Sequence, residues 1–197
     1  MIQLIHRIET EEERAFRRGK LGMAIFFVSL SMLFGGFLVG LFVLRARVAE
    51  WRPPGLGGLP WELWISTALL AIGSWQLWLA QRAAAVSRRA EVFPAVRRAT
   101  YALLAFLVAQ AAGWIDLTLH GFAPATRNLY TFSFYALTLL HALHVLGGFF
   151  PLYRVWRVAR ELGYGAAHHA GLSYCAMYWH YLGCVWVAIL VSLHALA

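Results

Sequence analysis

Charge is scarce in this sequence of 197 residues, because only 13% of them are Asp, Glu, Lys or Arg. Soluble domains contain about 25% of such residues, so most of this chain must lie in hydrocarbon or against other apolar helices. Cysteine is nearly absent as well. Cys175 and Cys184 are nine positions apart in one apolar run, too far along a helix to form a disulfide with each other. We interpret both as small buried hydrophobic residues.

Sequence motifs of catalysis and transport are also missing. The chain has no Gly-rich phosphate loop, no Cys-x-x-Cys pair and no nucleophile beside a base. Carboxylates are rare in the apolar runs, where Asp116 lies near the end of one and Glu62 at the start of another. A proton pump or ion-coupled transporter needs such groups at mid-membrane. These absences favour a subunit of a larger complex over a free-standing enzyme or transporter.

Long hydrophobic runs fill the chain instead, and 61% of the residues are hydrophobic. A helix crosses the hydrocarbon core with about 20 residues. The sequence therefore predicts an all-α, polytopic membrane protein, a single domain over residues 1–197 that forms a bundle of five transmembrane helices. The expected spans are 21–44, 61–80, 101–119, 129–156 and 171–196.

Three polar segments flank these spans: a charged head at 1–20, a basic loop at 82–98 and a connection at 157–169. We expect the head to form an amphipathic turn or short helix on the membrane surface. Thirteen of the 17 Lys and Arg residues lie in or next to these segments. The positive-inside rule then predicts a cytoplasmic N-terminus and a periplasmic C-terminus. Lipid headgroups explain the net charge of +8 better than nucleic acid does.

Three histidines interrupt the apolar spans: His141 and His144 on one helix face of 129–156, and His180 in 171–196. An imidazole at this depth is costly unless it faces protein, water or a ligand. A haem held between one of the first two and His180 is conceivable. Hydrogen bonds to neighbouring helices or to a lipid headgroup are the interpretation that we favour.

Several short motifs, in order, resemble the third subunit of haem–copper terminal oxidases, the cytochrome c and quinol oxidases. They are LGMAIFFVSLSMLFGG at 21–36, LWISTALLAIGS at 63–74, Gln110-x-x-x-Trp114, FSFYALTLLHALHVLGG at 132–148, and YWHYLGCVW at 178–186 after the pair His168 and His169. The resemblance runs through all five spans. The chain is similar to the five-helix form of the family, which lacks two N-terminal helices of longer members.

The resemblance implies a non-catalytic structural subunit of a respiratory oxidase in a prokaryotic inner membrane. It would dock on catalytic subunit I beside subunit II, bind phospholipid between its helices, and support proton uptake and stability. Haem and copper would belong to the partners, and this chain would hold no metal, cofactor or catalytic residue. An accessory subunit of nitric oxide reductase and a small membrane haem protein using His144 and His180 stay open as alternatives.

The residues that we expect to serve lipid binding or helix packing are polar or aromatic and lie within the spans. They are Gln110, Trp114, His141, His144, Tyr178, Trp179 and His180. The family usually carries acids where this chain has Leu30, Gly113 and Gly183. Loss of all three suggests that one polar network was removed as a unit. We therefore expect neutral imidazoles that bond to Gln, Ser or Tyr side chains or to lipid.

Overall fold

Five helices make up the fold of the described residues. The computed structural model of the protein describes residues 11–51, 53, 55–56, 58–124, 128–165 and 169–196. The helices are α1 (Glu11–Arg47), α2 (Glu62–Ala85), α3 (Arg89–Leu119), α4 (Leu129–Glu161) and α5 (Ala170–Ala195). Each of them is long and apolar enough to cross a membrane. The prediction of an all-α, multi-pass membrane protein is therefore confirmed.

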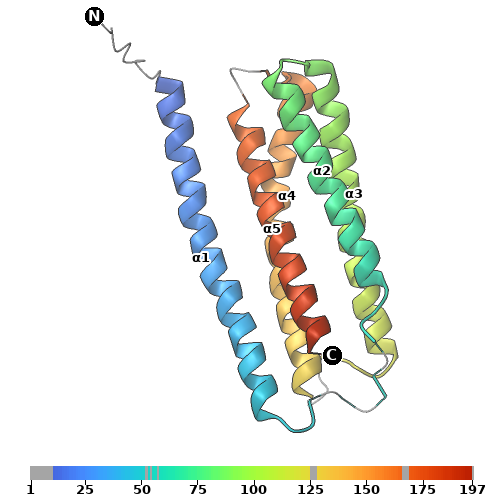
Figure 1. The fold of residues 1–197 in the computed structure, drawn as a ribbon. Coiled ribbons are helices and arrows are strands. Elements are labelled where there is room, and N and C mark those ends of the chain that lie inside the picture. Colours follow the sequence, from blue (N-terminus) through green and yellow to red (C-terminus); the bar gives the residue numbers. More distant parts are fainter. Residues whose placement is uncertain are drawn as a thin grey trace, which may run out of the picture.

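Helices α2 to α5 form a four-helix bundle, and α1 is attached to its side. Helix α2 packs against α3 and α5, and α4 packs against the same two helices, so the four close a ring. Helix α1 contacts α4 and α5. Figure 1 shows that the start of α1 stands away from the bundle, while its other end approaches α4. The largest fully buried side chains, among them Trp179, Trp186 and Phe106, lie inside the ring.

Two glycines set the spacing of helices within this bundle. A Cβ atom at Gly73 of α2 would lie 2.7 Å from the Leu103 side chain of α3. A Cβ atom at Gly148 of α4 would lie 2.8 Å from the Tyr178 ring and 3.1 Å from the Trp179 ring of α5. The separations of 2.7 and 2.8 Å are shorter than a real Cβ atom allows, so each of the two helix pairs depends on glycine at this point.

The helices extend further than the expected spans, and this corrects the predicted loops. Most of the basic loop at 82–98 is helical, because α2 runs to Ala85 and α3 begins at Arg89. Helix α4 likewise continues to Glu161, where Arg157 forms an ion pair with Glu161 at 3.2 Å. Arg, Glu and Ala favour helix as strongly as apolar residues do. A hydropathy pattern therefore marks the hydrocarbon boundary and not the end of the helix.

The charged head and one cysteine also differ from expectation. Residues 11–20 are not a separate surface helix but the first turns of α1, which is 37 residues long; residues 1–10 lie outside the described residues. Cys175 is buried as expected, but Cys184 is exposed on the same helix. Apolar composition alone cannot distinguish a position facing the bundle from one facing lipid.

Candidate functional site

His141 occupies the centre of the bundle and is surrounded by aromatic rings. Only 1% of its surface is exposed. Its ring centroid lies 5.3 Å from that of Trp186, 6.1 Å from Phe106 and 6.3 Å from Phe34. These rings come from α5, α3 and α1. In the described part of the chain neither ring nitrogen has a hydrogen-bond partner, so the expected Gln, Ser or Tyr partner is not found here.

The other two histidines serve different helix interfaces. The His144 Nδ1 atom lies 2.8 Å from the Leu140 carbonyl oxygen, and its ring lies 5.2 Å from that of Phe34 in α1. The His180 Nδ1 atom forms a hydrogen bond with the Ser74 hydroxyl of α2. A haem with two histidine ligands needs both imidazoles to face the same space. His144 and His180 face α1 and α2 respectively, which does not give that arrangement.

The remaining candidate residues bond or pack between helices. Gln110 donates from Nε2 to the Ser66 Oγ atom at 3.1 Å, which joins α3 to α2. Trp114 donates from Nε1 to the Thr138 Oγ1 atom at 3.1 Å, which joins α3 to α4. Trp179 is fully buried, with its ring 5.3 Å from Phe149. These contacts join or pack the helices of the bundle.

Tyr178 joins α5 to α4 and also faces α1. Its hydroxyl donates to the His144 carbonyl oxygen at 2.8 Å, and its ring lies 6.0 Å from that of Phe26. Of the pair that precedes α5, His168 lies outside the described residues, and His169 packs with its ring 6.1 Å from that of Phe16. Among the candidate residues, Tyr178 also lines a cleft between α1, α4 and α5.

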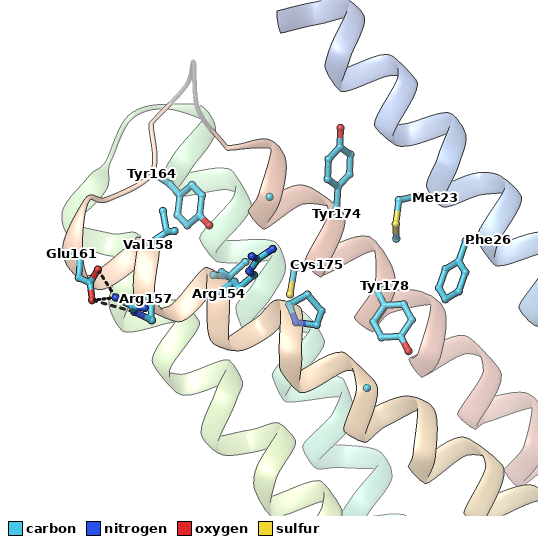
Figure 2. A pocket seen from close by; sticks show the side chains of 14 residues that line it. Met23, Phe26, Arg154, Arg157, Val158, Glu161, Tyr164, Tyr174, Cys175 and Tyr178 are labelled. Carbon is cyan, nitrogen blue, oxygen red and sulfur yellow. Dashed lines mark hydrogen bonds and ion pairs between the residues drawn. The ribbon is translucent and has the colours of Figure 1, made fainter.

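A cleft of about 930 Å³ opens between α1, α4 and α5. Figure 2 shows Met23 and Phe26 of α1 on one side, and Tyr174 and Tyr178 of α5 beside them. Helix α4 supplies the opposite wall with residues from Gly147 to Glu161. The lining is mostly apolar. Its size and chemistry suit an acyl chain with part of its headgroup.

Polar groups gather where α4 ends, at one end of this cleft. Arg157 is paired with Glu161, whereas Arg154 has no ion pair within the described residues and lies 5.4 Å from the Phe150 ring centroid. Tyr164 follows α4 in the chain and lies outside the spans. Burial, with a smaller contribution from the Cys175 thiol, raises the pKa of Tyr164 to about 12. Its hydroxyl is therefore neutral beside the arginines at ordinary pH.

Sequence reasoning missed all of the cleft except Tyr178. The missed residues that carry its polar chemistry are Arg154, Tyr164 and Tyr174. Arg154 gave a usable signal, because an arginine within an apolar run commonly reaches back to the membrane interface. The two tyrosines gave none, since aromatic residues are common near every membrane boundary.

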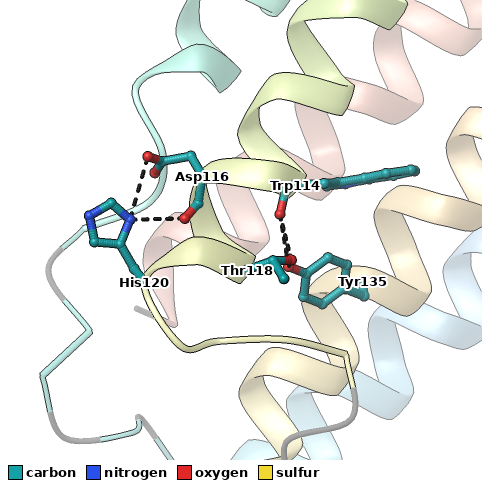
Figure 3. A network of polar contacts seen from close by, with 5 residues as sticks. All are labelled: Trp114, Asp116, Thr118, His120 and Tyr135. Carbon is teal, nitrogen blue, oxygen red and sulfur yellow. Dashed lines mark hydrogen bonds and ion pairs between the residues drawn. The ribbon is translucent and has the colours of Figure 1, made fainter.

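A second polar cluster lies at the C-terminal end of α3 (Figure 3). The Trp114 carbonyl oxygen accepts hydrogen bonds from Thr118 at 2.8 Å and from Tyr135 of α4 at 3.2 Å. His120 lies 3.4 Å from the Asp116 carboxylate, with 69% of the His120 side chain and 38% of the Asp116 side chain exposed. The cluster fastens α3 to α4 and leaves an exposed acid–imidazole pair at the surface. Asp116 is therefore not a buried group on a proton path.

Comparison with known proteins agrees with this helical arrangement. The family model of cytochrome c oxidase subunit III matches residues 7–197. The chain belongs to this family. The family resemblance found in the sequence motifs is thus confirmed.

Three relatives share the name cytochrome c oxidase subunit 3. The protein from Thermostichus vulcanus is 27% identical over 181 residues, which cover 89% of this chain and 86% of the relative. The protein from Synechocystis sp. is 25% identical, over 89% of this chain and 74% of its own length. The protein from Triticum aestivum is 29% identical, over 95% of this chain and 72% of its own length.

Within this family, the three positions without the expected acid have different surroundings. Leu30 is buried in the core with 6% of its surface exposed. A Cβ atom at Gly113 would lie 3.5 Å from the Cβ atom of Glu62, and one at Gly183 would meet no described atom within 4 Å. Glu62 of α2 therefore brings a carboxylate-bearing side chain next to the place where the acid of α3 is missing.

The described residues offer little for binding a metal. In the described ranges, no group of three or more His, Cys, Asp or Glu side chains lies close enough together to hold an ion. Several polar side chains within the bundle, among them an imidazole, an amide and an indole, instead form hydrogen bonds from one helix to another. This donor set suits helix packing in a membrane better than it suits redox chemistry.

Proposed function

We propose that this chain acts as subunit III of a respiratory haem–copper oxidase, where it is non-catalytic and docks on catalytic subunit I beside subunit II. The match to the family over residues 7–197 carries this proposal. The separate helix contacts of His144 and His180 support the non-catalytic role. Haem and copper then belong to the partner subunits. No observation favours a nitric oxide reductase subunit or a small haem protein instead.

The distribution of arginines supports a cytoplasmic N-terminus in a prokaryotic inner membrane. The start of α1, the turn between α2 and α3, and the end of α4 lie at the same end of the antiparallel bundle (Figure 1). This end carries most of the basic residues. The positive-inside rule assigns such an end to the cytoplasm. The cleft between α1, α4 and α5 then opens toward the cytoplasmic leaflet.

The cleft is the place where we expect the subunit to bind phospholipid. Met23, Phe26 and Tyr178 would contact an acyl chain, and the Arg154 guanidinium would bind the phosphate. Lipid held in this way fills apolar space between α1 and the bundle and so stabilises the attachment of the subunit. We propose that the subunit supports the stability and proton uptake of the catalytic subunit through this contact.

Purification of the complex through a tag on this chain tests the main proposal. We expect a partner that shows a haem spectrum to copurify, and we expect no Soret band from this chain after the partners are removed. A Soret band from the separated chain would contradict the non-catalytic role. Purification without any haem-bearing partner would contradict membership of the complex.

Quantitative lipid analysis of the purified complex tests the cleft. Arg154→Gln should lower the amount of anionic phospholipid per complex, because it removes the free guanidinium at the cleft. Arg160→Gln is the matched control, since Arg160 also lies in the last turns of α4 but does not line the cleft. An equal loss in both variants, or no loss in either, would count against lipid in this cleft.

A further inference from the structure

A layer of polar residues crosses the four-helix bundle at one level. It consists of Ser66 and Thr67 of α2, Gln110 of α3, His141 of α4 and Trp186 of α5, and we call it the polar layer. Four of these five are buried, with at most 3% of their surface exposed, and Thr67 is partly buried. Polar side chains so deep in a membrane domain are costly unless each finds a partner.

The hydroxyls of α2 already use their protons. Ser66 and Thr67 both donate to the Leu63 carbonyl oxygen, at 2.9 and 2.6 Å. Each hydroxyl oxygen can then only accept a further bond. Trp186 donates from Nε1 to Thr67 at 2.9 Å, and Gln110 donates from Nε2 to Ser66 at 3.1 Å. The bond from Gln110 to Ser66 fixes the orientation of the Gln110 amide. The Ser66 hydroxyl has already donated its proton, so it must face the Nε2 atom of Gln110 and not the Oε1 atom.

Three polar atoms of the layer are left without a partner. Among the described residues, the Gln110 Oε1 atom and both ring nitrogens of His141 are buried and form no hydrogen bond. A buried polar group without a partner costs about 1–3 kcal/mol. An ordered water molecule that bonds to such groups removes this cost, and buried waters in proteins occupy sites of this kind.

The helix register places Gln110 and His141 at almost the same height. The bond from Trp114 to Thr138 aligns α3 with α4. One step of four residues along α3 leads from Trp114 to Gln110, and three residues along the antiparallel α4 lead from Thr138 to His141. At 1.5 Å per residue the two positions differ in height by roughly 1.5 Å. The ring centroid of Phe106, one turn from Gln110 on the same helix, lies 6.1 Å from that of His141, so His141 packs against the stretch of α3 that contains Gln110.

The unpartnered atoms define what can bind between them. A neutral imidazole offers one N–H donor and one acceptor, and the Gln110 Oε1 atom is an acceptor. Water has two donors and can also accept, so it can bond to Gln110 and to either nitrogen of His141, whichever tautomer is present. A cation is disfavoured, because the layer contains no carboxylate or thiolate.

We propose that the polar layer binds at least one ordered water molecule, bridging the Gln110 Oε1 atom and a ring nitrogen of His141. The water completes the hydrogen bonds between α3 and α4 at this level and thereby fixes their register. It gives His141 a partner in a chain that lacks the buried acids at Leu30, Gly113 and Gly183. This site is separate from the lipid cleft, and it does not depend on the proposed role in the oxidase.

A high-resolution cryo-electron microscopy structure of the purified complex tests the site directly. We expect density for a water within hydrogen-bond distance of both the Gln110 Oε1 atom and a His141 nitrogen. A direct hydrogen bond between the two side chains would overturn the proposal. So would the absence of density here at a resolution that shows other internal waters.

A double-mutant cycle tests it independently. His141→Phe and Gln110→Leu should each lower the melting temperature of the subunit by roughly 5 °C, since each leaves one side of the water site unpaired. The double variant should lose no more than the worse single variant, because both residues hold the same water. Strictly additive losses would overturn the proposal.

Thr138→Val combined with His141→Phe is the matched control pair. Thr138 lies one turn from His141 on the same helix but bonds directly to Trp114. We expect these two losses to add. If this pair coupled as strongly as Gln110 with His141, the coupling would reflect general repacking of α4 and would contradict a shared water. If His141→Phe fails to assemble, His141→Gln replaces it in both pairs. Because glutamine keeps a donor and an acceptor, it can still bond to the water, and the coupling energy with Gln110 should then be smaller.

Discussion

Helix α1 and the bundle of α2 to α5 differ in how much of their apolar surface is buried within the protein. In the most apolar window of α5 half of the residues are buried within the protein, whereas in that of α1 only 17% are. The bundle helices interlock through close glycine contacts and hydrogen bonds between side chains. Helix α1 is held by a few separate contacts, and most of its surface faces outward (Figure 1).

The contacts of α1 are spread along α5. Tyr174 donates to the Phe16 carbonyl oxygen at 2.9 Å, Ser31 bonds to Tyr181 at 2.9 Å, and the ring of Phe27 stacks on that of Tyr181 at 4.6 Å. The difference between the two regions shows that the bundle is stabilised by its own packing. Helix α1 instead leaves most of its apolar surface outside the packing of the described residues.

The largest expected effect comes from disturbing the bundle itself. Gly148→Ala should destabilise the subunit by about 2 kcal/mol, because the new methyl group would collide with the rings of Tyr178 and Trp179. Gly183 of α5 provides the matched control, since a Cβ atom there meets no described atom within 4 Å and the residue does not line the cleft. Gly183→Ala should be neutral or slightly stabilising. Thermal release of the subunit from the complex measures both, and equal losses would refute the interlocked packing.

A smaller effect is expected where α1 is attached. Tyr174→Phe removes the hydrogen bond to the Phe16 carbonyl oxygen and should cost about 1 kcal/mol. Amide hydrogen exchange in the first turns of α1 should then rise roughly fivefold, while exchange in α4 stays unchanged. Tyr153→Phe is the control, because Tyr153 is exposed on α4. Faster exchange in the bundle as well would show that α1 is not a separate, weakly held element.

The smallest effect concerns pH at the cleft. The pKa of Tyr164 is raised to about 12 by burial, so the folded protein favours the neutral phenol. This contribution to stability is complete below pH 10, the ordinary pKa of tyrosine, and is lost as the pH rises toward 12. We therefore expect no change in lipid retention from Tyr164 between pH 6 and 9. Ultraviolet titration of the wild type and of Tyr164→Phe measures the pKa of Tyr164. A tyrosinate signal from Tyr164 below pH 10 would contradict its burial.

Several features could be predicted from the sequence because they depend on local composition. The five spans follow from apolar length, and the family follows from short motifs such as FSFYALTLLHALHVLGG at 132–148. The helix ends were predicted less well, since Arg89 to Arg98 are compatible with both loop and helix. The prediction that Cys184 is buried was wrong, because hydropathy does not say which side of an apolar helix faces the protein.

The sequence by itself determined that this protein crosses the membrane five times, belongs to its family and has few buried acids, since each of these depends on which residues are present and in what order. Only the tertiary structure decided which polar groups meet. It separated His144 from His180, left polar atoms of Gln110 and His141 buried without a partner among the described residues, and opened the cleft beside Arg154. The physical reason is that helix rotation and register control these contacts, and a few packing interactions between distant residues set them.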